Sequence, residues 1–285
     1  MGILGLTACA PSPVISSSFP SQTPLLADAT AVLLTAAASW RNESTPFTTA
    51  IADQLLYYAR FTSRQDPLNS RSGLSDGLVE PTTSESVEAT MGILLPALEE
   101  HYLTALENSQ VNVARLWASI LVSARSAYTL VNEGLRGNEL APELGDFIPW
   151  EAPIDGNEIV KELSDNLYLL RKLTTAAIGL GGGGIDALLR SILIQVDGEL
   201  DILTLAGVSH DDPLPSGLPV TDRQSLATSI PETLARYGST NREYWIRSAL
   251  VKESLLGDGI EAAARWDVFV RRLGGRSPYW PGWQQ

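Results

Sequence analysis

Four acidic side chains that could act together in catalysis lie near the start of one predicted helix: Asp76, Glu80, Glu85 and Glu88. Two carboxylates within about 10 Å of each other, one protonated and one ionised, can serve as acid and base in cleaving a glycosidic bond. If the fold brings two of these acids into one cleft, a glycan is the expected substrate. The other interpretation is that the glutamates stabilise the helix start, where the helix dipole favours negative charge.

Tryptophan side chains could supply a stacking surface for sugar rings, because an indole combines a large apolar face with one N–H donor. The candidates for ligand binding are Trp150, Trp245, Trp280 and Trp283. The alternative is that these rings belong to the core, or cover an apolar groove.

The segment from 57 to 98 carries a resemblance to a known class of enzymes. Tyr57-Tyr58-Ala59-Arg60 lies on one predicted helix, a polar loop with two glycines follows, and Glu80-Pro81-Thr82 opens the next helix. This layout resembles the hairpin–loop–hairpin arrangement of α/α-toroid carbohydrate enzymes. The resemblance implies that acidic and aromatic residues gather in the loops at one end of the helix pairs.

Two glycine motifs match signatures of other enzymes but lack the required context. Gly179–Gly184 fits G-x-G-x-x-G, yet a helix precedes it where a dinucleotide site needs a strand. Gly73–Gly77 fits G-x-S-x-G, yet no strand enters or leaves it, as a nucleophile elbow requires. We therefore expect a turn between helices and a polar loop.

Metal and cofactor sites are not expected. The two histidines, His101 and His210, have no glutamate three residues before them, so the Glu-x-x-His pairs of a di-iron bundle are missing. The single cysteine excludes a cysteine-rich zinc site.

That cysteine stands in a suggestive context, Leu6-Thr7-Ala8-Cys9. The tetrapeptide resembles the lipobox of bacterial lipoproteins, which implies lipidation of Cys9 and a protein of the cell envelope that faces the periplasm or the exterior. Residues 10–23 are rich in proline and serine, as in a flexible tether. Met1 to Leu6 contains no Lys or Arg, so a complete signal would begin upstream. The alternative is a chance tetrapeptide.

Composition limits the classes of partner. The chain has 285 residues, 44% of them hydrophobic, which suffices for a helical core. The net charge of −13 argues against a nucleic-acid partner, because phosphate binding needs clustered Lys and Arg. No run of about 18 apolar residues predicts a membrane span.

The clearest structural pattern is an αα-hairpin over Thr82 to Val131. Apolar residues recur every three or four positions on both arms. Thr82 and Glu85 could form a capping box, and Pro96 predicts a kink or a new helix start. The stripes are Val87, Met91, Leu94, Leu98, Tyr102 and Leu106, then Val113, Leu116, Ile120, Ala124 and Tyr128.

Similar patterns extend over the rest of the chain. They predict helices from Pro24 to about Trp40 and from Pro46 to about Ser63, and a second hairpin after Asp155. Shorter helices are expected to start at Ser229, Thr240 and Asp258, each with a glutamate three residues later.

The predicted fold is all-α, with about seven to nine helices in consecutive antiparallel hairpins that form a bundle or a partial α/α array with three long loops. We expect a signal and tether over 1–23, one helical domain over 24–276, and an aromatic, proline-rich tail over 277–285 that covers an apolar groove.

The sequence favours an envelope-anchored lipoprotein that binds a protein or glycan partner and reaches the membrane through a lipid on Cys9. A glycan-processing hydrolase or lyase is the first alternative. A structural component of a virion or other assembly is the second.

Overall fold

The computed structural model describes residues 24–63, 77–142, 156–181, 184–209, 211–278 and 280–282. These residues form nine α-helices and no β-strand, so the predicted all-α class is confirmed. The helices are α1 Pro24–Asn42, α2 Pro46–Thr62, α3 Val87–Glu107, α4 Val111–Asn132, α5 Gly156–Gly179, α6 Asp186–Leu205, α7 Val220–Thr228, α8 Ile230–Val251 and α9 Leu256–Arg272.

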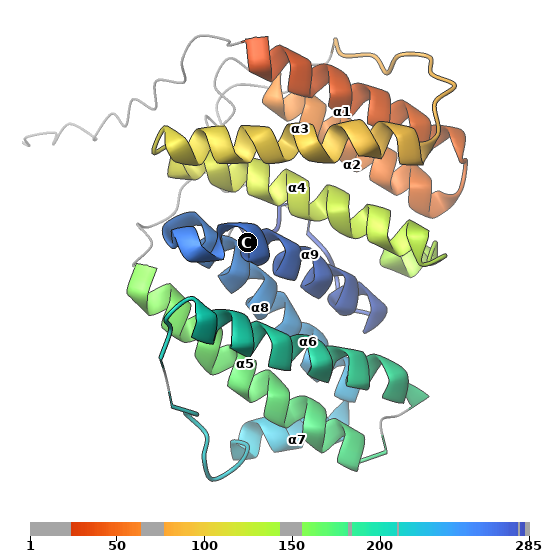
Figure 1. Cartoon of the computed structure of the whole chain (residues 1–285). Coiled ribbons are helices and arrows are strands. Elements are labelled where there is room, and N and C mark those ends of the chain that lie inside the picture. The colour runs from red at the N-terminus through yellow and green to blue at the C-terminus, as the bar shows by residue number, and fades with distance from the viewer. Residues whose placement is uncertain are drawn as a thin grey trace, which may run out of the picture.

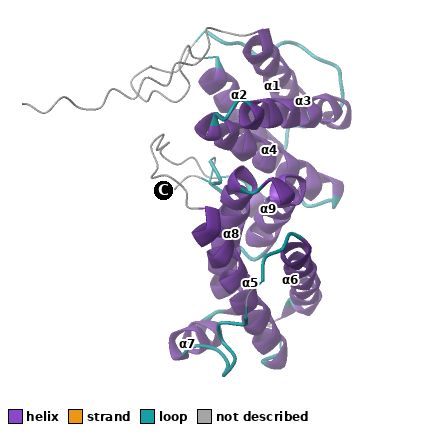
Figure 2. Ribbon diagram, turned by 60° about the vertical axis from the view of Figure 1, so that its left-hand side comes forward, coloured by secondary structure: helices purple, strands orange, loops and turns teal. Residues whose placement is uncertain are grey.

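Eight of the helices pack as neighbouring pairs: α1 with α2, α3 with α4, α5 with α6, and α8 with α9. The pairs stack in layers, in the order α1–α2, α3–α4, α8–α9 and α5–α6, as Figures 1 and 2 show. The last pair in the sequence therefore lies between two earlier ones, with α9 against α4 and α8 against α5. The short α7 packs against α8.

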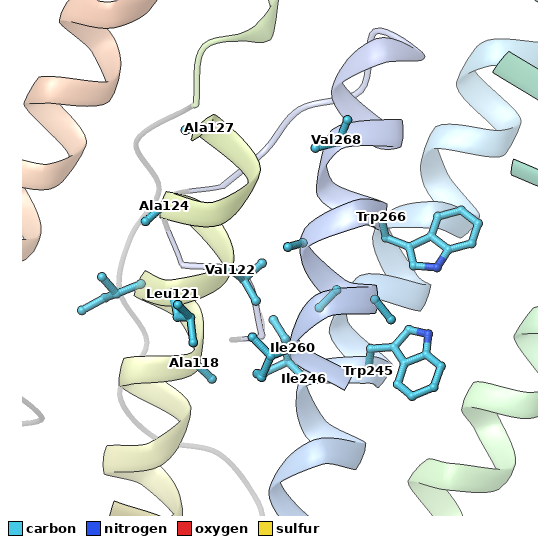
Figure 3. Close-up of a cluster of buried hydrophobic side chains, with 14 of the residues drawn as sticks. Ala118, Leu121, Val122, Ala124, Ala127, Trp245, Ile246, Ile260, Trp266 and Val268 are labelled. Carbon is cyan, nitrogen blue, oxygen red and sulfur yellow. The ribbon is translucent and has the colours of Figure 1, made fainter. Parts of the chain in front are cut away.

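Apolar side chains from all four pairs form one continuous buried cluster. At its centre, Ala118 and Val122 of α4 lie on the side of that helix that faces Ile246 of α8 and Ile260 of α9 (Figure 3). Small side chains let helices approach closely, and this contact joins the N-terminal half of the stack to the C-terminal half.

The start of α3 differs from the prediction. Ser86 caps the helix, accepting a hydrogen bond from the backbone N–H of Ala89 at 3.2 Å. The capping box at Thr82 and Glu85 is therefore wrong. The hydroxyl of Thr83 instead accepts the N–H of Glu85, so this segment precedes the helix. Pro96 starts no new helix, and α3 continues through it.

The predicted start of α8 at Ser229 is confirmed, because its hydroxyl accepts the N–H of Glu232 at 3.4 Å. The predicted start at Thr240 is wrong, since α8 runs through that position without a break. Gly238 lies inside α8. A Cβ atom there would lie 3.1 Å from the ring of Trp266, so glycine lets α9 pack closely on α8.

Candidate functional site

The predicted catalytic acids have different environments. Glu80 accepts hydrogen bonds from Arg41 Nε at 2.8 Å and Nη2 at 2.6 Å, and Asp53 accepts from the same guanidinium at 2.9 Å. Glu85 and Glu88 are exposed, just before α3 and in its first turn. Asp76 lies outside the described residues. Glu80 is thus neutralised by an arginine, while the two exposed glutamates lie where the dipole of α3 favours them.

The two described tryptophan candidates are buried. Trp245 is 0% exposed and Trp280 is 1% exposed. Neither ring therefore offers a face to a sugar in this structure. Trp150 and Trp283 lie outside the described residues.

Trp245 instead belongs to a buried polar cluster around Glu199 of α6, a residue that sequence reasoning missed. The Glu199 carboxylate is 0% exposed. It accepts hydrogen bonds from Gln195 Nε2 at 2.8 Å, Asn241 Nδ2 at 3.1 Å, Trp245 Nε1 at 2.7 Å and Trp266 Nε1 at 2.7 Å. Figure 3 shows the two indoles on the side of α8 and α9 that faces away from α4.

Two further hydrogen bonds orient the amides of Gln195 and Asn241. Asn166 Nδ2 on α5 donates to Asn241 Oδ1 at 3.1 Å, and Arg265 Nη1 donates to Gln195 Oε1 at 3.1 Å. Each amide oxygen is thereby occupied, and each amide nitrogen points at the Glu199 carboxylate. Burial raises the pKa of Glu199 to about 7, although the surrounding donors oppose this rise.

A second buried network surrounds Asp267 of α9, which is 0% exposed. It binds Arg242 Nη1 at 2.7 Å and Arg271 Nη2 at 2.9 Å. The hydroxyls of Ser126 and Ser277 each donate to it at 2.6 Å. Burial alone would raise the pKa of Asp267, but the two guanidinium groups and the two hydroxyls outweigh it and hold the pKa at about 2.

Both networks serve to join helices. Glu199 connects α6 to α8 and α9, and Asp267 connects α9 to α4, α8 and the C-terminal segment. Protein side chains donate several hydrogen bonds to each carboxylate, and neither carboxylate reaches solvent. The geometry therefore favours a structural role over catalysis.

The one described histidine, His101, belongs to the buried interior. His101 is buried and stacks on Trp117, with ring centroids 4.6 Å apart. Burial lowers the pKa of His101. His210 lies outside the described residues. Among the residues that the structure places, no group of three or more His, Cys, Asp and Glu side chains could hold a metal ion.

Two surface hollows formed by described residues flank the start of α8, with volumes of about 480 and 560 Å³. Neither of the two is lined by Glu80, Glu85 or Glu88. Both are lined by Ser229, Glu232 and Arg236. Arg236 lies over the ring of Tyr237, 4.9 Å from its centroid, and 3.9 Å from Asp222.

The outer face of α3 exposes several apolar side chains. The side chain of Ile93 is 56% exposed and that of Leu103 is 38% exposed, with Pro96 exposed between them. These three residues recur at helical spacing and so share one face. The opposite face carries Met91, Leu94, Leu98 and Tyr102, which are buried against the neighbouring helices α1 and α4.

The charges on α3 are all negative. The helix carries Glu88, Glu99, Glu100 and Glu107 and no Lys or Arg. All four are exposed. Glu99 forms an ion pair with Arg125 at 3.5 Å. The other three glutamates form no ion pair with any residue that the structure describes. We call the exposed residues 93, 96 and 103, with these four glutamates, the α3 face.

Comparison with known proteins identifies no relative. No protein-family model, no curated protein and no solved structure matches the chain.

Proposed function

We propose that this protein acts by binding a partner protein, and that the α3 face is its docking surface. The observation that supports the proposal is the combination, on one outward helix face, of exposed apolar side chains with three exposed glutamates that form no ion pair within the described residues. Apolar side chains such as Ile93 gain free energy when a partner removes them from water.

The chemistry of the α3 face specifies the kind of partner. Its apolar centre fits the apolar stripe of an amphipathic helix, a common mode of peptide recognition. Its glutamates fit lysine or arginine side chains on the flanks of that stripe. The net charge of −13 would also accelerate the approach of a cationic partner. The expected partner is therefore a protein with a basic amphipathic helix.

The glycan-processing alternative lacks comparable support. Glu80 is held by Arg41, and Trp245 and Trp280 are buried. An enzyme of this kind needs two carboxylates and an aromatic platform in one open cleft. The described residues offer no such combination around these positions.

We further propose that a lipid on Cys9 attaches the helical domain to the cell envelope, where residues 10–23 would act as a tether. Among the described helices, none combines the length and the apolar content that a membrane span requires. A single lipid chain binds membranes only weakly, whereas several chains give stable attachment.

Mass spectrometry of the protein purified from bacterial membranes tests the anchor. We expect the mature chain to begin at Cys9 with a diacylglyceryl group on its sulfur. A Cys9→Ala variant should be recovered in the aqueous fraction. A mature chain that retains residues before Cys9 and a free thiol would contradict the anchor and leave the docking proposal untouched.

A designed peptide tests the docking surface. The probe is a helical peptide with leucines at i, i+3, i+4 and i+7 and lysines elsewhere, because this pattern matches the α3 face. We expect binding that weakens as salt concentration rises, since surface charges are screened. Ile93→Asp should weaken binding by about tenfold or more, as measured by fluorescence anisotropy.

The matched control is Ile194→Asp on α6, because Ile194 is 73% exposed on a different layer of the stack. This change adds the same charge and should leave the affinity of the peptide unchanged. A version of the peptide with glutamates in place of lysines should not bind. Equal effects of Ile93→Asp and Ile194→Asp would show only nonspecific attraction and would rule out the α3 face as the docking site.

A further inference from the structure

The segment that follows α9 crosses several helices that are remote from it in sequence. The chain turns at Gly274, whose φ is 78°. Its described residues then contact α9 through Ser277, α2 through Trp280, and α4 and α8 through Pro281 and Gly282.

The indole of Trp280 occupies an aromatic slot on α2. Its ring centroid lies 4.7 Å from that of Phe61, 4.8 Å from that of Tyr58 and 5.9 Å from that of Tyr57. The ring is 1% exposed. Burial of so large a side chain, together with edge-to-face contacts, makes this slot the strongest apolar anchor of the segment.

The next two residues are held through their main chain. The Ser119 hydroxyl on α4 donates to the carbonyl oxygen of Pro281, and the N–H of Gly282 donates to the Glu243 carboxylate on α8. Gly282 has φ of 90°, and a Cβ atom there would lie 2.7 Å from Cγ2 of Ile246. Only glycine therefore fits this position.

Ser277 provides a third point of attachment. Its hydroxyl donates to Asp267 Oδ1 at 2.6 Å and accepts from Arg271 Nη2 at 3.0 Å. The two partners are also held by contacts that do not involve this segment. Asp267 binds Arg242, and Arg271 donates to the carbonyl oxygen of Leu140 at 2.9 Å. The floor of the groove is thus positioned independently of the segment that covers it.

We infer that α2, α4, α8 and α9 form a peptide-binding groove that recognises the pattern hydroxyl-x-x-Trp-Pro-Gly, and that the chain fills this groove with its own Ser277 and residues 280–282. The groove supplies an indole slot, a side-chain donor for the Pro281 carbonyl oxygen, a side-chain acceptor for the Gly282 N–H and a buried partner for a hydroxyl. Such a set of preorganised contacts is typical of a peptide receptor. This inference is independent of the α3 docking surface.

The groove and the segment that fills it belong to the same chain, and this explains how an irregular segment can stay buried. A covalently linked ligand has a high effective concentration, which offsets the entropy lost on ordering it. A free peptide of the same sequence should therefore compete poorly with the intact chain, and should bind once the connection is cut or the resident segment is weakened.

Cleavage of the folded full-length protein tests the inference. A specific protease site is inserted after Arg276, which is exposed. After cutting, we expect the released fragment to co-elute with the helical domain in gel filtration. After removal of the fragment, a synthetic 277–285 peptide should rebind, and a peptide with alanine in place of Trp280 should bind about tenfold more weakly or worse. Immediate loss of the fragment on cutting would overturn the inference.

The uncut variant Trp280→Ala provides a second test if the cut domain does not stay folded. Its slot is open, so the fluorescently labelled 277–285 peptide should bind to it more tightly than to the wild-type chain. The labelled peptide with alanine at the tryptophan position is the control. A folded Trp280→Ala chain that binds both peptides equally, or neither, would contradict a groove that recognises the indole.

Discussion

Replacing Asp267 with alanine is expected to lower the free energy of unfolding by about 3–5 kcal/mol. The side chains of Arg242 and Arg271 are 2% and 1% exposed, and both bind this carboxylate. Its removal leaves positive charge buried with less compensation, and Ser126 loses the acceptor of its hydroxyl. Urea unfolding followed by circular dichroism measures the loss.

Glu261→Ala is the matched control, because it removes a carboxylate from the same helix. Glu261 pairs with Arg265 at 3.1 Å, but both side chains are about half exposed, at 46% and 55%. Solvent screens such a pair, and its loss should cost less than about 1 kcal/mol. Similar losses for the two variants would mean that the Asp267 network contributes no more than a surface ion pair.

The pH dependence of the free energy of unfolding provides an independent test of the same network. The pKa of Asp267 is about 2 in the folded protein, below its ordinary value of 3.8. The stabilisation by the ionised carboxylate is therefore present above pH 3.8 and is lost as the pH falls through 2. The Asp267→Ala variant should lack this part of the acid sensitivity of the wild-type protein.

The helices were predictable because their signal is local. An apolar residue every three or four positions, as in Met91, Leu94 and Leu98, can form a buried stripe only on a helix. The pairing of α3 with α4 followed from the short connection between them. The order of the layers was not predictable, because the α8–α9 pair inserts between pairs that precede it in the sequence, and no local pattern encodes that contact.

The buried networks were missed for a different reason. The acids predicted to matter lie near a helix start, where they could be catalytic or could stabilise the helix. Glu199 lies three residues after Val196 and four before Leu203, on the apolar stripe of α6. An acid at such a position must find donors inside the protein, and this spacing was a usable signal. Which donors would meet it depends on tertiary contacts with α8 and α9, which a single sequence does not display.

Glu199→Gln is expected to remove a large part of the pH dependence of stability near neutrality. The pKa of Glu199 is about 7 in the folded protein, against 4.5 for an exposed glutamate. Because the folded state holds the proton more tightly, the contribution of this group is complete below pH 4.5 and is lost as the pH rises through 7. That difference in pKa corresponds to a change of about 3 kcal/mol in the free energy of unfolding. Urea unfolding between about pH 5 and 8 measures the slope.

Asp201→Asn on the same helix is the control, because Asp201 is exposed and the change again replaces a carboxylate with an amide. This variant should keep the wild-type slope, whereas Glu199→Gln should flatten it. Parallel profiles for the wild type and Glu199→Gln would mean that the carboxylate stays ionised throughout. In that case the hydrogen bonds from Gln195, Asn241 and the two indoles would outweigh burial, and the cluster would hold a permanent buried charge.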